Sequence, residues 1–438
     1  MNRPRRTIPA TYDVPVPRRI RAALVAGAAA VVVGGGALLV AGGGSGTPGW
    51  TPGPPAGAFS DSALTDAAQR VLDARSRAID NHDRAAFAAT LADPHGGYGT
   101  AQLADYDRMT RLPISGAGSA VTSVRDRADG TFVAAVDSSY LLTDYDRGPH
   151  TYPTAFAFVR HGHGWLLTDP GADDNATEAQ PWDLPGMRVA RSATTLVIGN
   201  VSVDRLEAYR RAVDDAVARV GTVWHRDWPH RVVVVAPATV REALAQLGGS
   251  RGNGHDLDDV AAETSGTIPS GGVATSDRVV VNPAAFDDLR EEGRVAVLAH
   301  ETTHVAVRSS LPGRVPLWLS EGFADFVGYG SIDVSEHAVV EPLRREVRGH
   351  GLPQRLPGDA AFTGDSAAAA YNEGWLAVRL IDREAGSTGL TRFYETAATS
   401  GGASDVRRST TRAFATVLHT SESDFTRRWV AEVAQATS

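Results

Sequence analysis

The stretch "LAHETTHVA", residues Leu298 to Ala306, decides how the C-terminal half of the chain folds. It carries the pattern H-E-x-x-H, with His300 and His304 four residues apart and Glu301 between them. On a helix, side chains four residues apart lie on one face, so the two imidazoles point toward one position, as ligands of a Zn²⁺ ion do. Glu301 lies about 100° further round the helix, where a carboxylate can take a proton from water. The alternative for this pattern alone is a surface helix with two incidental histidines.

A third ligand follows in the segment "PLWLSEGFADFVGYG". Glu321 lies 17 residues after His304, and the break "LPGRVP" at 311–316 lets one helix end and a second return antiparallel. A lone Glu beside aromatic residues such as Trp318 is costly to bury unless it is paired or bound to metal. Two His and one Glu leave a coordination position open for water, which is typical of a hydrolytic zinc site. We therefore expect His300, His304 and Glu321 to bind one Zn²⁺ ion.

The motifs "HETTH" and "WLSEGFADF" together resemble the gluzincin metallopeptidases, the superfamily of aminopeptidase N and thermolysin. The resemblance is closest to their bacterial peptidase-MA-like branch and covers residues 193–438. It implies that His300, His304 and Glu321 are zinc ligands and that Glu301 is the general base and acid. Asp325, one turn after Glu321, matches a carboxylate that orients a ligand imidazole. The alternative for Asp325 is a solvated charge on a helix surface.

A later segment, "AAAAYNEGWLAVRLIDREAG", resembles the Tyr-x-x-Gly helix of the aminopeptidase N group. Tyr371 matches the tyrosine whose hydroxyl donates to the oxyanion formed during peptide hydrolysis in that group. An ordinary core tyrosine is the alternative.

The chain departs from the aminopeptidases in two places. The gap of 16 residues between His304 and Glu321 is shorter than in aminopeptidase N or thermolysin, so the connection must be tighter. No Gly-x-Met-Glu-Asn-like stretch precedes the H-E-x-x-H helix, where "GVATSDRVVVNP" stands instead. That stretch grips the free amino terminus of the substrate in aminopeptidases. Its absence favours an endopeptidase over an aminopeptidase.

Composition excludes several other classes of protein. The 438 residues allow two or three domains, and 42% hydrophobic with 21% charged residues is ordinary for globular protein. A net charge of −8 gives no general attraction to nucleic acid. The absence of cysteine excludes disulfides, thiolate metal sites and a cysteine nucleophile. All 43 basic residues are Arg, which is typical of a GC-rich bacterial genome.

The N-terminus predicts export. Residues 1–21 form a basic cytoplasmic segment with six Arg, and residues 22–41 are uncharged over 20 residues. A span of about 20 apolar residues crosses a bilayer as a helix, and the basic flank stays in the cytoplasm. We expect a single-pass membrane protein with its C-terminal domains outside the cytoplasm. The alternative is a cleaved signal segment and a secreted protein. Residues 42–60 are a Gly/Pro-rich linker.

Residues 61–170 predict an α+β unit. A helix capped by Ser60 or Ser62 comes first, and strand-like runs follow, two of them joined by a hairpin at 162–164. The pattern resembles the ketosteroid-isomerase-like cone fold, which hosts both enzymes and binding modules. His161 and His163 are candidate metal ligands, but the flanking glycines favour a position at a turn.

The rest of the chain completes the predicted organisation. Residues 171–192 are expected to form a polar linker, and residues 193–438 a gluzincin-like domain with a small mixed sheet followed by helices from Phe286 onward. The predicted fold class is therefore α+β, with two exported domains behind one N-terminal transmembrane helix.

Two functions compete for this organisation. The preferred one is a membrane-anchored extracytoplasmic zinc metallopeptidase that hydrolyses peptide or protein substrates. The alternative is a non-catalytic binding protein, with a cone-like ligand-binding domain and a peptidase-like zinc scaffold. Nucleic acid is not an expected partner, because the only Arg cluster precedes the membrane segment. The sequence indicates no particular oligomeric state.

Overall fold

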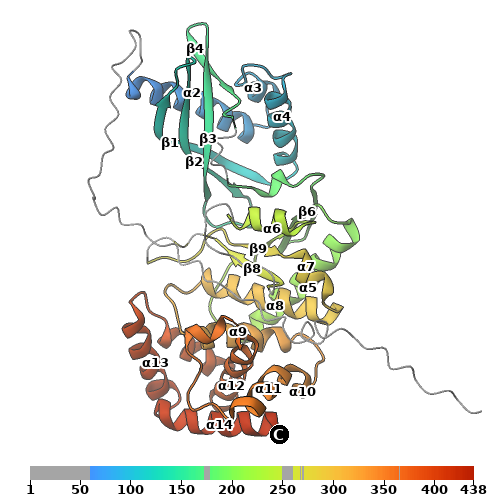
Figure 1. Ribbon diagram of the computed structural model, residues 1–438, viewed down its shortest axis with the longest axis vertical. Coiled ribbons are helices and arrows are strands. Elements are labelled where there is room, and N and C mark those ends of the chain that lie inside the picture. Colours follow the sequence, from blue (N-terminus) through green and yellow to red (C-terminus); the bar gives the residue numbers. More distant parts are fainter. Residues whose placement is uncertain (1–59, 172–177, 249–259, 267, 269–270, 365) are drawn as a thin grey trace, which may run out of the picture.

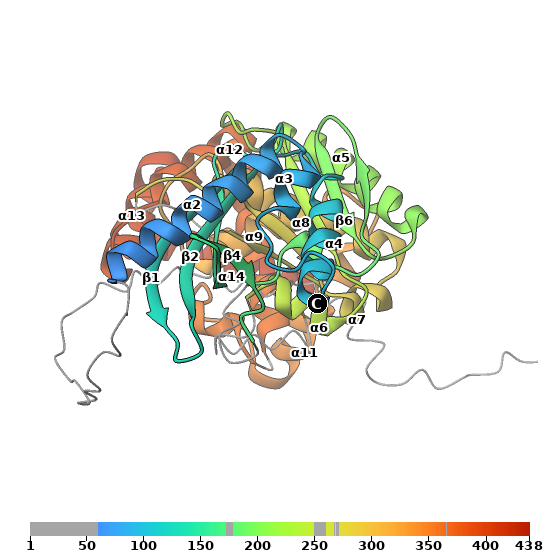
Figure 2. The same cartoon turned by 90° about the horizontal axis from the view of Figure 1, so that it is seen from above.

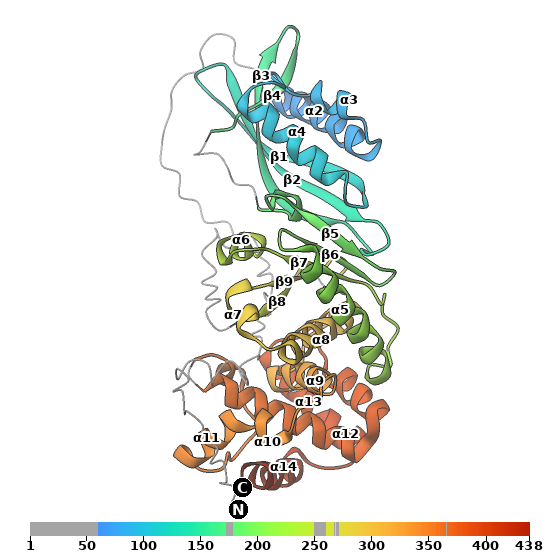
Figure 3. The ribbon, with the colours of Figure 1, turned by 90° about the vertical axis from the view of Figure 1, so that its right-hand side faces the viewer.

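Residues 60–171, 178–248, 260–266, 268, 271–364 and 366–438 are described by a computed structural model. An N-terminal helix-and-sheet unit, a second sheet and a group of helices follow one another along its longest axis, which confirms the α+β class (Figures 1 and 3). The expected basic segment, membrane segment and spacer fall in residues 1–59, outside this description. Among the described residues, no helix is both long and apolar enough to cross a membrane.

The N-terminal unit is an antiparallel sheet in the order β1-β2-β3-β4, with α2 lying across it (Figure 2). Ser60 caps α2 by accepting a hydrogen bond from the backbone N–H of Ala63, as one of the two predicted caps. Alternate residues of β2, such as Phe132 and Ala134, pack against Leu72 of α2. The elements are α2 (Asp61–Asp80), α3 (Arg84–Ala88), α4 (Gly97–Met109), β1 (Ile114–Asp126), β2 (Thr131–Leu142), β3 (His150–His161) and β4 (Gly164–Thr168).

The hairpin between β3 and β4 lies where the sequence predicts it. Gly162 has a φ of +60°, a conformation that glycine adopts without strain, and it turns the chain between His161 and Gly164. His161 and His163 are exposed at this turn. The turn position, rather than a metal site, therefore accounts for both histidines.

The second sheet is mixed, in the order β5-β6-β7-β9-β8. The three inner strands β6, β7 and β9 are parallel, and the two edge strands pair antiparallel. Part of the expected linker 171–192 belongs to this sheet, because residues 188–191 pair with β6 and bury Ala190. The elements are η2 (Pro181–Asp183), β5 (Arg188–Arg191), β6 (Thr195–Gly199), α5 (Val203–Val223), β7 (Val232–Ala236), α6 (Val240–Gln246), β8 (Ala262–Ser265) and β9 (Arg278–Val281).

The remaining chain is helical, as predicted from Phe286 onward. Helix α12 changes direction at Gly386, whose φ of +71° suits glycine. The elements are α7 (Pro283–Asp288), α8 (Glu291–Arg308), α9 (Leu317–Tyr329), α10 (Glu336–Val339), α11 (Glu341–His350), η3 (Asp359–Phe362), α12 (Ala367–Ala397), α13 (Ala403–Val417) and α14 (Glu422–Thr437).

The second sheet is buried on both faces. One face, including Val197 and Val234, packs in a core shared with α5 and α8. The other face, including Leu196 and Val233, packs in a core shared with the N-terminal unit. Burial on both faces explains why the inner strands read as continuous runs of Val rather than as alternating patterns. The two units therefore form one packed structure around this sheet.

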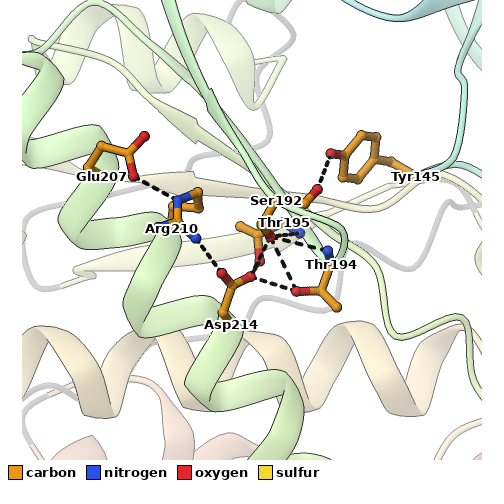
Figure 4. Close-up of polar contacts among 7 residues, drawn as sticks. All are labelled: Tyr145, Ser192, Thr194, Thr195, Glu207, Arg210 and Asp214. Carbon is orange, nitrogen blue, oxygen red and sulfur yellow. Dashed lines mark hydrogen bonds and ion pairs between the residues drawn. The ribbon is translucent and has the colours of Figure 1, made fainter.

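A polar cluster fastens the turn between β5 and β6 to α5 (Figure 4). The hydroxyls of Ser192, Thr194 and Thr195 each donate to one carboxylate oxygen of Asp214, at 2.6, 2.6 and 2.7 Å. Burial alone would raise the pKa of Asp214. The three hydrogen bonds and the charge of Arg210 outweigh burial, so the pKa of Asp214 lies below its usual value. In the same cluster, the hydroxyl of Tyr145 in the N-terminal unit donates to the Ser192 carbonyl at 2.7 Å.

Helices α9 and α12 touch backbone to backbone. A Cβ atom added at Gly322 would lie 2.3 Å from the carbonyl oxygen of Gly374, so neither position accommodates a larger side chain without a shift of the helices. This close contact fixes the position of Glu321, which precedes Gly322 on α9.

We expect Gly322→Ala to destabilise the protein by about 1–3 kcal/mol, because the helices must separate. Gly349→Ala is the matched control, since its added Cβ would meet no atom within 4 Å. Thermal unfolding of both variants measures the difference. Equal melting temperatures for Gly322→Ala and wild type would contradict the close crossing.

Candidate metal centre

Helix α8 carries the H-E-x-x-H pattern through the protein interior. Every residue from Ala296 to Val307 is buried, so both faces of the helix are packed. The hydroxyls of Thr302 and Thr303 donate to carbonyl oxygens four residues earlier, at 2.7 and 2.8 Å, which satisfies them without solvent. Acidic residues in the first turn and Arg308 in the last turn suit the helix dipole.

His300, His304 and Glu321 converge as the sequence predicts. The two Nε2 atoms lie 3.0 Å apart, and each lies 3.4 Å from Oε2 of Glu321. A tetrahedral ion with ligand bonds of about 2.0–2.1 Å separates its ligand atoms by about 3.3–3.4 Å. Both separations from Glu321 match this spacing and the separation between the two Nε2 atoms is slightly shorter, so the three atoms approximate one face of such a tetrahedron. All three side chains are buried, and the group can hold a metal ion.

The unsatisfied oxygens of this cluster fit a cation. Among the described residues, no hydrogen-bond donor satisfies either carboxylate oxygen of Glu321, and Oε1 of Glu301 also has none. Three buried carboxylates, including that of Asp325, surround only two imidazoles. With all three carboxylates ionised, the cluster would keep an excess negative charge even if both imidazoles were protonated. A bound divalent cation would compensate that charge and satisfy the ligand oxygens.

Asp325 holds the ring of His300 in place. Its Oδ1 lies 2.9 Å from Nδ1 of His300, on the side of the ring opposite the Glu321 oxygen. Asp325 is buried, so the alternative of a solvated surface charge is wrong. Burial lowers the pKa of His300, but Asp325 and Glu321 raise it to about 10 overall. When Nδ1 of neutral His300 donates its proton to Asp325, the lone pair lies on Nε2. Nε2 is the nitrogen that faces His304 and Glu321.

Glu301 is anchored by one oxygen only. The hydroxyl of Thr264, on edge strand β8, donates to Oε2 at 2.6 Å. Burial raises the pKa of Glu301, and this effect exceeds the opposing effects of His300 and His304. A carboxylate with a raised pKa and one oxygen without a donor is suited to accept a proton.

Strand β8 contributes two residues that the sequence analysis missed. Thr264 contacts Glu301, and the neighbouring Glu263 is also buried. Burial and the charge of Glu301 raise the pKa of Glu263 to about 7, while Arg308 opposes the shift. The only sequence signal is the run "AETS", which is too short to predict a strand or its pairing with β9.

Tyr371 lies on α12, one turn before Gly374, where α12 touches α9. The side chain is buried, and its ring packs edge-on against Phe362 with centroids 5.1 Å apart. Its role as an oxyanion donor stays a prediction.

Comparison with known proteins does not assign this chain to a family. No family model matches it, and no curated protein matches its sequence. The gluzincin and cone-fold resemblances therefore remain predictions.

Asp325→Ala is expected to lower zinc affinity by roughly 10–100-fold, because His300 loses the acceptor that orients its ring. Titration against a chelating indicator measures this. Asp333→Ala, an exposed carboxylate soon after α9, is the control and is expected to bind zinc as wild type does. Unchanged affinity in Asp325→Ala would show that the His300 contact does not tune metal binding.

Proposed function

We propose that this chain is a zinc metallopeptidase with a gluzincin-like centre formed by His300, His304 and Glu321. The observation that supports it most is the tetrahedral spacing of three buried ligand atoms beside a carboxylate suited to act as a base. The sequence pattern of residues 1–41 adds the proposal that the enzyme is anchored in the membrane and acts outside the cytoplasm.

The donor set favours zinc over the harder divalent cations. Two imidazole nitrogens and one carboxylate are typical of catalytic zinc, whereas magnesium and calcium prefer oxygen ligands. When bound, Zn²⁺ would polarise a peptide carbonyl and increase the acidity of a water molecule.

The protein side chains would carry the proton steps. Glu301 would accept a proton from the attacking water on Oε1, while Thr264 keeps Oε2 in place. Glu301 would then give that proton to the departing amine. Tyr371 would donate a hydrogen bond to the oxyanion, as the resemblance of its helix implies.

Glu301→Gln tests this assignment directly. We expect peptide cleavage to fall by about 10²–10⁴-fold while zinc stays bound, because the amide cannot accept the proton. The measurements are zinc content and cleavage of a peptide library analysed by mass spectrometry. Glu292→Gln is the matched control, an exposed residue in the first turn of the same helix. The proposal fails if the wild type purifies without about one zinc per chain, or if Glu301→Gln cleaves as well as wild type.

Glu263 gives a reason to test aminopeptidase action as well. Glu263 lies on edge strand β8 and is a buried acid whose pKa is raised by burial and by the charge of Glu301. The chain therefore has a further carboxylate near the metal centre, although it lacks the Gly-x-Met-Glu-Asn stretch. Endopeptidase action remains our proposal, because that stretch is missing.

We expect a peptide and its N-acetylated form to be cut at internal bonds at similar rates. An endopeptidase needs no free amino terminus, so acetylation removes nothing that it recognises. Product masses and initial rates for the two peptides provide the measurement. Cleavage confined to the free peptide, with KM raised in Glu263→Gln, would instead establish an aminopeptidase.

The non-catalytic scaffold is the second candidate. The observation that favours it is the burial of the centre, where His304 is only 5% exposed and Glu301 0%. A scaffold would lose thermal stability when zinc is chelated but would show no chelator-sensitive cleavage. The library experiment therefore separates the two functions.

A further inference from the structure

The N-terminal unit contains a cavity that the metal centre does not use. Its volume is about 540 Å³, within the range of small-molecule sites. The walls come from α2, α4, β3 and residues around η2. They include the side chains Arg75, Tyr98, Met109, Tyr152, Phe156 and Trp182.

Arg75 is a buried cation on the wall of this cavity, only 6% exposed. Its guanidinium lies 3.9 Å from the centroid of the Phe87 ring, and Nη2 donates to the side-chain oxygen of Gln102. Nη1 is buried without an acceptor in the part of the chain that the structure describes. Among the described residues, no carboxylate lies within ion-pair distance of Arg75. Burial lowers the pKa of Arg75, and this effect exceeds the opposing effect of the more distant Asp105 carboxylate. A buried cation without a direct ion-pair partner is costly, and a ligand carboxylate would supply that partner.

The acidic groups of the cavity are already engaged. Asp105 pairs with Arg108 and also accepts from the Gln102 side-chain nitrogen at 3.2 Å. Asp169 accepts from the backbone N–H of Gly171 at 2.9 Å, and Asp183 from that of Gln180 at 2.7 Å. Arg75 is the one cation among the residues that line the cavity in the described structure, and it has no ion-pair partner there.

We propose that this cavity binds an organic monocarboxylate with an aromatic or apolar body, and that the ligand carboxylate pairs with the guanidinium of Arg75. One guanidinium without an ion-pair partner matches one carboxylate. The aromatic and aliphatic walls match the body of the ligand, since such surfaces gain free energy when water leaves them. The three acids in the lining disfavour a phosphate dianion, because its second charge would face carboxylates with no added cation.

The site is independent of the proposed peptidase activity. Its residues belong to the N-terminal unit and to residues 169–171 and 179–183, and none of them is a ligand of the metal centre. A failed zinc test therefore leaves this proposal intact, and the reverse also holds.

The test uses the full-length chain and 3-phenylpropionate, measured by titration calorimetry. 3-Phenylpropanamide has nearly the same shape without the charge, and phenylpropyl phosphate carries the second charge. Arg75→Met removes the charge but keeps an unbranched apolar side chain. Arg77→Met, an exposed position on the same helix, is the matched control.

We expect 3-phenylpropionate to bind wild type and Arg77→Met alike, and to bind Arg75→Met roughly 10–100-fold more weakly. The amide and the phosphate should bind wild type more weakly than the carboxylate. The melting temperature of free Arg75→Met should equal or exceed that of wild type, because an unpaired buried charge is replaced by an apolar group.

Three results would overturn the proposal. One is no binding of 3-phenylpropionate at millimolar concentration, and another is equal binding by Arg75→Met. The third is equal or tighter binding of the amide or the phosphate by wild type, a comparison that decides the matter even if Arg75→Met does not fold.

Discussion

The burial of carboxylates and imidazoles where α8 meets α9 is the constraint on which the C-terminal half depends. Ionised groups in a protein interior are stable only when counter-charges or hydrogen bonds replace water. Asp325 engages one nitrogen of His300, and Thr264 engages one oxygen of Glu301. The oxygens of Glu321 receive no donor from the described residues, and a bound cation could supply the remaining compensation.

Such a centre needs a rigid surround, because a shift of one ångström would separate the three ligand atoms. The backbone contact between Gly322 and Gly374 fixes α9 from one side. The second sheet fixes α8 from the other side, through edge strand β8 and through the core shared with α5. The N-terminal unit in turn covers the far face of that sheet, where Asp146 and Arg278 form a buried ion pair at 2.7 Å. Packing far from the centre therefore limits how its ligands can move.

The parts of the site that could be predicted from sequence are those set by helix periodicity. His300 and His304 are four residues apart, and so are Glu321 and Asp325, so each pair shares a helix face whatever the rest of the chain does. Glu263 and Thr264 could not be predicted, because their position depends on the pairing of a four-residue strand with β9. The strand at 188–191 was missed for the same reason, since its partner β6 decides that it is a strand and not a linker. Contacts between distant segments leave little trace in a single sequence.

The same electrostatic reasoning applies at both ends of the molecule with opposite sign. The metal centre gathers carboxylates in excess of its cations, whereas Arg75 in the N-terminal cavity is a buried cation without a direct ion-pair partner. Two other largely buried arginines in the described structure are paired, Arg308 with Asp277 at 2.8 Å and Arg278 with Asp146. The unsatisfied carboxylates of the metal centre and the unpaired guanidinium of Arg75 both cost folding free energy. Their cost in folding free energy is accounted for if each is compensated when its own ligand binds, a cation at one and an anion at the other.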